Sequence, residues 1–273
     1  MSAESSKLPV TSSTEPAWAD DARECYEGVL QALQEARVPF AVSGGFAFHH
    51  HTGIWRATKD LDLVLTPDAV PAAFKVLQCR GFETWIEDPV WLAKARHLGY
   101  FVDLITGVGN ATLTVEESWI ERAIPDRMLG IRCKVLRAEE MIASKLFVTR
   151  RERFDGADIA HLVKACSQQL DWDRLLSLAG THRDILYWHL VLFATIYPSQ
   201  VGLVPADVWR SLTEDFKRRI SHPDPDEPFR GSLIDPKMFA IDVDEWGQRD
   251  LLRELSENYP HLLQIKESGR NEP

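Results

Sequence analysis

The chain has 273 residues, of which 45% are hydrophobic and 26% charged, and its formal net charge is −10. This composition is typical of a soluble globular protein with one or two domains, and no run approaches the roughly 20 apolar residues that span a bilayer. The acidic balance argues against broad electrostatic binding to nucleic acid. The N-terminus has no signal-like pattern and the four cysteines lie far apart, so we expect reduced thiols in a cytoplasmic protein without a membrane partner.

The first half of the chain alternates predicted helices and strands. Residues 1–18 are rich in Ser, Thr and Pro, which predicts a disordered leader. The elements expected after this leader are a helix at 19–36, a strand at 39–42, a glycine turn and helix to about residue 52, a loop to 59, a strand at 60–65, a helix at 69–79, a strand at 82–86, a hairpin of 91–97 and 99–105, and a strand at 131–136.

Strand patterns vanish in the second half of the chain. Helices are predicted at 138–151, 155–167, 171–180, 183–198, 205–220 and 248–258, and the stretch 222–247, rich in Pro and acids, predicts a long loop. The sequence therefore predicts an α+β fold, with an α/β domain over 19–137 followed by a helical domain over 138–273.

Three acids lie on predicted strands. Asp60 and Asp62 are two residues apart, so their side chains point to the same face of a strand. Asp103 is a single acid in an apolar strand, where a carboxylate is costly unless it is paired, hydrogen-bonded or bound to metal. Two adjacent strands can bring the three carboxylates around Mg²⁺ or Mn²⁺. A solvated strand end is the alternative interpretation of the Asp-x-Asp pattern on its own.

Two further features suit a nucleotide. Ser43-Gly44-Gly45 opens a predicted helix whose first backbone N–H groups can hold phosphates. Lys145 lies at the edge of the apolar stripe of helix 138–151, where a lysine needs an anion. A triphosphate tail is one explanation for Lys145, and a snorkelling side chain or an ion pair with an acid of the same domain is equally open. Asp155 and Asp158 are at least as well explained by helix capping as by catalysis.

The order Gly44-Gly45, Arg56-x-Thr58-x-Asp60-Leu61-Asp62 and then Asp103 resembles the nucleotidyltransferases of the DNA polymerase beta superfamily, and most of all their abortive-infection toxin (AbiEii-like) type. The resemblance covers about residues 38–165. It implies a nucleotidyltransferase fold, a small mixed sheet with flanking helices. It assigns catalysis and metal binding to Asp60, Asp62 and Asp103, and nucleotide binding to Ser43, Gly44, Gly45, Arg56, Thr58 and Lys145.

The resemblance also implies a reaction, the Mg²⁺-dependent transfer of a nucleoside monophosphate from an NTP such as ATP to an acceptor hydroxyl. The acceptor can be an RNA end, a protein or a small molecule, and a toxin of this type would have a cognate antitoxin as partner. Two alternatives stay open. One is an enzyme that modifies a small molecule such as an aminoglycoside, which the acidic net charge favours. The other is a non-catalytic module that binds a nucleotide or a partner on the same fold.

Overall fold

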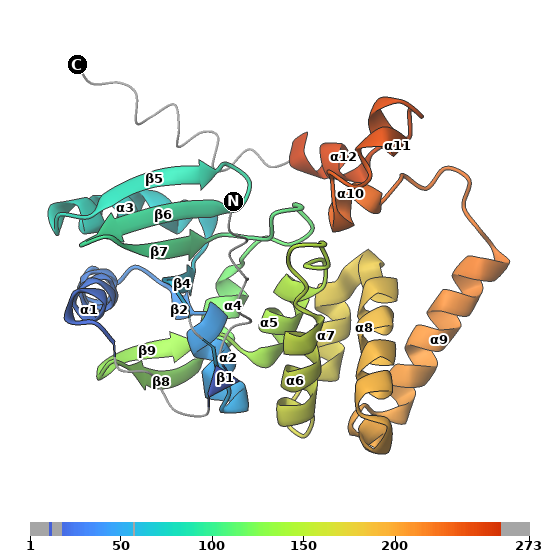
Figure 1. Cartoon of the computed structure of the whole chain (residues 1–273), viewed down its shortest axis with the longest axis horizontal. Helices are drawn as coiled ribbons and strands as arrows, with labels where there is room; N and C mark the ends of the chain where they lie inside the picture. The colour runs from blue at the N-terminus through green and yellow to red at the C-terminus, as the bar shows by residue number, and fades with distance from the viewer. Residues whose placement is uncertain (1–10, 13–17, 57, 258–273) are drawn as a thin grey trace, which may run out of the picture. The chain divides into compact units, whose positions relative to one another are not determined.

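The computed structural model describes residues 11–12, 18–56 and 58–257, which form two compact units (Figure 1). The first, the sheet unit, comprises Met1–Glu87, Leu92–Ile105 and Glu116–Leu136. The second, the helical unit, comprises Asp88–Trp91, Thr106–Val115 and Arg137–Pro273. Among the described residues, no helix combines the length and apolarity required to cross a bilayer. Most of the leader predicted over 1–18 lies outside the described residues.

The sheet unit contains a seven-stranded mixed sheet in the order β5-β6-β7-β4-β2-β9-β8. β4 runs parallel to β7 and antiparallel to β2, and β2 runs parallel to β9. The strands are β2 (Ala41–Val42), β4 (Asp60–Val64), β5 (Glu83–Asp88), β6 (Leu92–His97), β7 (Tyr100–Ile105), β8 (Ile124–Met128) and β9 (Ile131–Val135). The predicted mixed sheet is thus confirmed.

A separate antiparallel pair joins β1 (Thr11–Ser12) to β3 (Trp55–Arg56). Part of the predicted leader and part of the predicted loop before residue 60 are therefore extended and paired. The sequence did not predict this because each strand is only two residues long and shows no period.

Four α-helices accompany the sheet within its described residues: α1 (Asp20–Glu35), α2 (Gly44–Thr52), α3 (Val70–Cys79) and α4 (Glu117–Arg122). The 3₁₀ helix η1 (Pro67–Ala69) leads into α3. The apolar stripe of α1 is fully buried, with Cys25, Val29 and Leu33 in the core, as its spacing predicts. Alternate residues of β4 complete this core, because Leu61 and Leu63 are also fully buried.

Two tight hairpins shape the sheet. β6 and β7 are joined by Leu98 and Gly99, whose φ angles of 51° and 82° match the left-handed backbone of a two-residue hairpin turn. This confirms the hairpin predicted there. β8 and β9 are joined in the same way by Leu129 and Gly130. The sequence missed β8, because this edge strand is mostly exposed and contains Pro125, so it shows neither alternation nor an apolar run.

The helical unit follows the predicted succession of helices with two corrections. Its helices are α5 (Ala138–Lys145), α6 (Gly156–Cys166), α7 (Trp172–Ala179), α8 (Arg183–Ile196), α9 (Ala206–Ser221), α10 (Gly231–Ile234), α11 (Ala240–Asp244) and α12 (Leu251–Glu257), with 3₁₀ helices η2 (Gly180–His182) and η3 (Pro198–Leu203). The helix predicted over 138–151 ends at Lys145. The stretch 222–247, predicted as a loop, contains α10 and α11.

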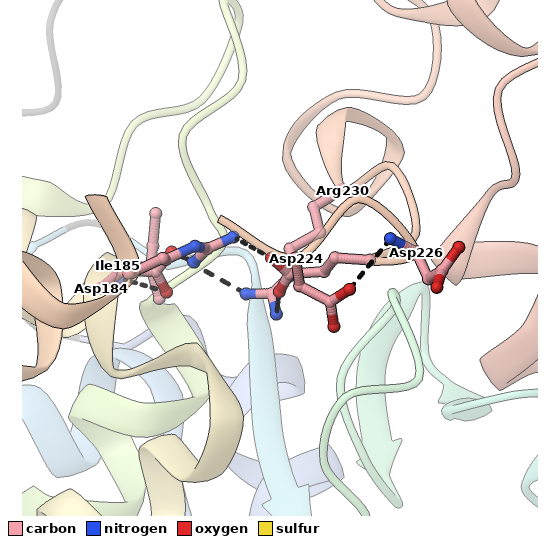
Figure 2. Close-up of polar contacts among 7 residues, drawn as sticks. Asp184, Ile185, Asp224, Asp226 and Arg230 are labelled. Atoms are coloured by element: carbon pink, nitrogen blue, oxygen red, sulfur yellow. Dashed lines mark hydrogen bonds and ion pairs between the residues drawn. The ribbon is translucent and has the colours of Figure 1, made fainter. Parts of the chain in front are cut away.

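A ring of alternating charges fixes the segment after α9 to the start of α8 (Figure 2). Asp184 is paired with both Arg219 and Arg230, and Glu227 is paired with the same two arginines. The Arg219 Nη2–Glu227 Oε2 distance is 3.1 Å. Because every charge has two partners of opposite sign, the ring holds a segment with little regular structure in a defined place.

Candidate active site

The three predicted acids lie on one face of the sheet, on the adjacent parallel strands β4 and β7. Asp62 is the register partner of Asp103, and Asp60 is that of Phe101. Since side chains alternate along a strand, Asp60, Asp62 and Asp103 share a face. The residues between them, Leu61 and Val102, point to the opposite face and are fully buried.

The start of α2 presses against Asp62. Gly44 is the first residue of α2 and has a φ of 56°, which favours glycine. A Cβ atom at this position would lie 1.8 Å from Asp62 Oδ2, so no larger residue fits without moving the carboxylate. The backbone N–H of Ser43 also donates to the carbonyl oxygen of Asp62 at 2.8 Å. The glycine turn and the acidic strand therefore form one local structure, with the positive end of a helix at the carboxylate.

A lysine that the sequence analysis did not single out completes the acidic row. Lys94 of β6 is the register partner of Asp103, and its Nζ donates to Asp103 Oδ1 at 2.8 Å. The two side chains are only 19% and 13% exposed. The two-residue turn at Leu98-Gly99 would have been sufficient to find this pair, because it fixes which residues of the hairpin face each other.

Burial and charge act together on this pair. Burial raises the pKa of Asp103, and the negative charges of Asp60 and Glu87 add to this, against the lowering effect of the Lys94 hydrogen bond and charge. Burial acts to lower the pKa of Lys94, but the hydrogen bond and charge of Asp103, with Asp60 and Glu87, outweigh it and raise this pKa. The negative charges of Asp60 and Glu87 thus favour the protonated form of both members of the pair.

The donor set suits a divalent cation, although its side chains do not enclose one as they stand. Across residues 11–12, 18–56 and 58–257, no group of three or more His, Cys, Asp and Glu side chains is placed to hold a metal ion. Carboxylate oxygens on one face are nevertheless the ligands that Mg²⁺ and Mn²⁺ prefer. Asp103 already binds the ammonium group of Lys94, a cation of the protein itself.

Two of the other predicted residues support neighbouring elements. Thr58 Oγ1 donates to the carbonyl oxygen of Asp60 at 2.8 Å, which holds the first residue of β4. Arg56 lies on β3 with its guanidinium carbon 4.7 Å from the centre of the Phe48 ring, a cation–π contact. Thr58 thus acts on the position of an acid, while Arg56 packs on α2.

Lys145 belongs to the helical unit, where it forms ion pairs with two acids. Its Nζ lies 2.5 Å from Asp155 Oδ2 and 3.0 Å from Asp158 Oδ2, and all three side chains are largely buried. Burial acts to raise the pKa of Asp155, but Lys145 and Arg153 outweigh it and hold this pKa below its usual range. Of the possibilities that the sequence left open for Lys145, the structure contains the ion pair.

Residues 26–191, more than half of the chain, match the family described as "Nucleotidyltransferase of unknown function (DUF6036)". No curated protein matches the sequence.

Several solved structures are similar to the chain. The antibiotic-resistance factor ANT(2'')-Ia is 15% identical, with 59% of this chain and 91% of that chain covered and a TM-score of 0.43. An antigenic nucleotidyltransferase-like protein from Paracoccidioides brasiliensis is 17% identical, with 72% and 96% covered and a TM-score of 0.41. The lincosamide antibiotic adenylyltransferase LnuA is 14% identical, with 51% and 94% covered and a TM-score of 0.36.

Proposed function

Because the chain belongs to the nucleotidyltransferase family that matches its residues 26–191, we propose that it transfers a nucleoside monophosphate from an NTP to an acceptor hydroxyl, with Asp60, Asp62 and Asp103 as the catalytic acids. The observation that carries this assignment is the shared register of Asp62 and Asp103 on adjacent parallel strands. It places two carboxylates of distant sequence on one face, next to the start of α2.

In this reaction the acceptor oxygen forms a bond to the α-phosphorus, the bond from that phosphorus to the bridging oxygen breaks, and pyrophosphate leaves. Mg²⁺ or Mn²⁺ bound by Asp60, Asp62 and Asp103 would neutralise charge on the phosphates. Asp103 accepts the proton of the attacking hydroxyl, a role that suits a carboxylate whose pKa is raised by burial.

The phosphates themselves are assigned to the start of α2. The backbone N–H groups after Ser43, at Gly44 and Gly45, have no acceptor earlier in their own helix and can donate to phosphate oxygens. Thr58 keeps β4 in place through Asp60. Nucleotide contacts by Arg56 and Lys145 are part of the same proposal, on the strength of the sequence resemblance.

The candidate functions differ in the molecule that accepts the nucleoside monophosphate. An RNA end or a protein hydroxyl would fit a toxin of the abortive-infection type with a cognate antitoxin. The sequence motifs favour this interpretation. A small cationic acceptor is the second candidate, and the net charge of −10 favours it because a cation is drawn to an acidic protein. A module that binds nucleotide without turnover is the non-catalytic alternative.

The test is incubation with labelled NTPs, Mg²⁺ or Mn²⁺, and RNA, protein or aminoglycoside acceptors. The double variant Asp60→Ala/Asp62→Ala is expected to lose about a thousandfold in rate. Asp68→Ala, which removes an exposed acid shortly after β4, is the matched control and should transfer like the wild type. Equal transfer by the wild type and the double variant would refute the assignment. NTP binding by calorimetry without any transfer would favour the non-catalytic module.

A further inference from the structure

Lys94, Asp103 and Asp62 form a row across three neighbouring strands. Lys94 on β6 pairs with Asp103 on β7, and Asp103 pairs with Asp62 on β4. Register partners on adjacent strands point to the same face, so one ammonium group and two carboxylates lie side by side. Among the described contacts, the ammonium group of Lys94 donates a hydrogen bond to one of these carboxylates, that of Asp103, at 2.8 Å.

Neither member of the pair is well solvated. With side-chain exposures of 19% and 13%, Lys94 and Asp103 have lost most of their contact with water. A charge in such a place requires a partner of opposite sign. Asp60 and Asp62 add two further negative charges on the same face. In the absence of any added cation, the ammonium group of Lys94 therefore compensates the charge of Asp103.

We propose that Lys94 is an internal counter-cation, and that a divalent cation gains Asp103 as a ligand only by displacing the Lys94 ammonium from it. An ammonium group and a divalent ion on the same carboxylate would repel each other at a distance of a few ångströms. Cation binding is accordingly an exchange in which the Lys94–Asp103 ion pair breaks. This inference rests on the proposed function only for the choice of the acids.

The exchange predicts two effects of removing the Lys94 ammonium group, and their combination distinguishes it from a purely structural role. Removing the ammonium leaves the largely buried Asp103 without its Lys94 partner, so the protein without divalent cations becomes less stable. The same change removes the competitor, so Mg²⁺ and Mn²⁺ bind more tightly. A structural role alone would lower stability without improving the affinity for cations.

The experiment is a calorimetric and thermal-unfolding titration of the full chain with MgCl₂ or MnCl₂ at constant ionic strength, without nucleotide. We expect the dissociation constant of Lys94→Met to be about tenfold lower than that of the wild type. Lys94→Arg, which retains the charge and can bind a carboxylate with two N–H groups, should bind the cations no more tightly than the wild type. Lys75→Met, which removes an exposed lysine on α3, is the control for net charge and should behave like the wild type.

An unchanged or higher dissociation constant for Lys94→Met would overturn the inference, as would the absence of cation binding in the wild type and all variants. If Lys94→Met does not fold without divalent cations, recovery of folding by Mg²⁺ or Mn²⁺, but not by K⁺, supports the exchange, and failure of every cation to restore folding contradicts it. Failure of the proposed function gives a different pattern. Nucleotidyl transfer would then be absent while the effect of Lys94→Met on cation affinity persisted.

Discussion

Asp62 and Asp103 occupy the same register on β4 and β7, and on the other side of the sheet their neighbours Leu63 and Leu104 are fully buried. The carboxylates are therefore placed by a packed sheet and not by a loop. A substitution that removes a carboxylate leaves the packing of the opposite face intact. At Asp62, loss of activity in such a variant would report on chemistry more than on folding.

Gly44→Ala is expected to reduce nucleotidyl transfer by about a hundredfold or more, because its Cβ would displace the Asp62 carboxylate from a position 1.8 Å away. Rate measurements with a labelled NTP, together with urea unfolding, check this. Gly53→Ala is the matched control, since Gly53 also has a positive φ but has nothing within 4 Å of the added Cβ. Gly53→Ala should lose about 1 kcal/mol of stability and retain its rate. Equal rates for the two variants would contradict the prediction.

Lys145→Met is expected to lower the free energy of unfolding by about 3 kcal/mol, because Asp155 and Asp158 would remain buried without their shared partner. Urea unfolding measures the loss. Arg153→Met provides the comparison: it removes a second partner of Asp155 whose side chain is 69% exposed, and it should cost at most about 1 kcal/mol. A loss in Lys145→Met of at most about 1 kcal/mol, as expected for Arg153→Met, would show that the ion pairs of Lys145 contribute little. The Michaelis constant for NTP in Lys145→Arg separately tests whether Lys145 contacts the nucleotide.

The stability of the helical unit should decrease as the pH falls below about 6.5, the ordinary pKa of histidine. Burial lowers the pKa of His189, against the opposing effect of its hydrogen bond to the Leu146 carbonyl. Below about pH 6.5, His189 therefore binds a proton more readily in the unfolded chain than in the folded one. The stabilising contribution is complete above the unfolded pKa and is lost as the pH falls toward the lowered folded value. Urea unfolding from pH 7.5 to 5.5 should show a smaller decrease in His189→Gln than in the wild type, and equal decreases would exclude His189 as the cause.

Cys79 should be the first cysteine to react with a maleimide in the folded protein. Cys79 is exposed, whereas burial raises the pKa of each of the other three thiols to about 11, so that few of them are ionised at pH 8. The three are Cys25, Cys133 and Cys166. Mass spectrometry of the labelled peptides checks the order, and labelling of Cys25 as fast as Cys79 would contradict the burial described for it. Urea should make all four reactive.

Several elements encoded by local sequence were predicted correctly. The spacing of apolar residues over α1, the Gly44-Gly45 turn and the Leu98-Gly99 hairpin each specify their structure within a few residues. The acids Asp60 and Asp62 share a face through strand alternation alone. The pairing of Asp62 with Asp103, by contrast, depends on which strands are neighbours in the sheet, and local sequence patterns do not specify strand order.

The end of α5 shows why other predictions failed. The apolar pattern continues past Lys145, and it predicted a helix to residue 151. In the structure the carbonyl of Leu146, which would accept from residue 150 in a longer helix, accepts instead from His189 Nε2 at 2.8 Å. The backbone N–H of Asp155 donates to the Val148 carbonyl at 2.9 Å, which closes the following turn. A partner as distant in sequence as His189 overrides a local preference.

The length of the Leu98-Gly99 turn, finally, determines which residue of β6 lies opposite Asp103. Surface turns are usually where a protein tolerates insertions, because nothing depends on their length. Here the turn decides that Lys94 faces Asp103. Adding one residue would shift β6 by one position and turn Lys94 to the opposite, buried face, with Ala95 in its place. Among related chains, gaps are therefore expected to be rare at this turn, even though neither of its residues touches the acids.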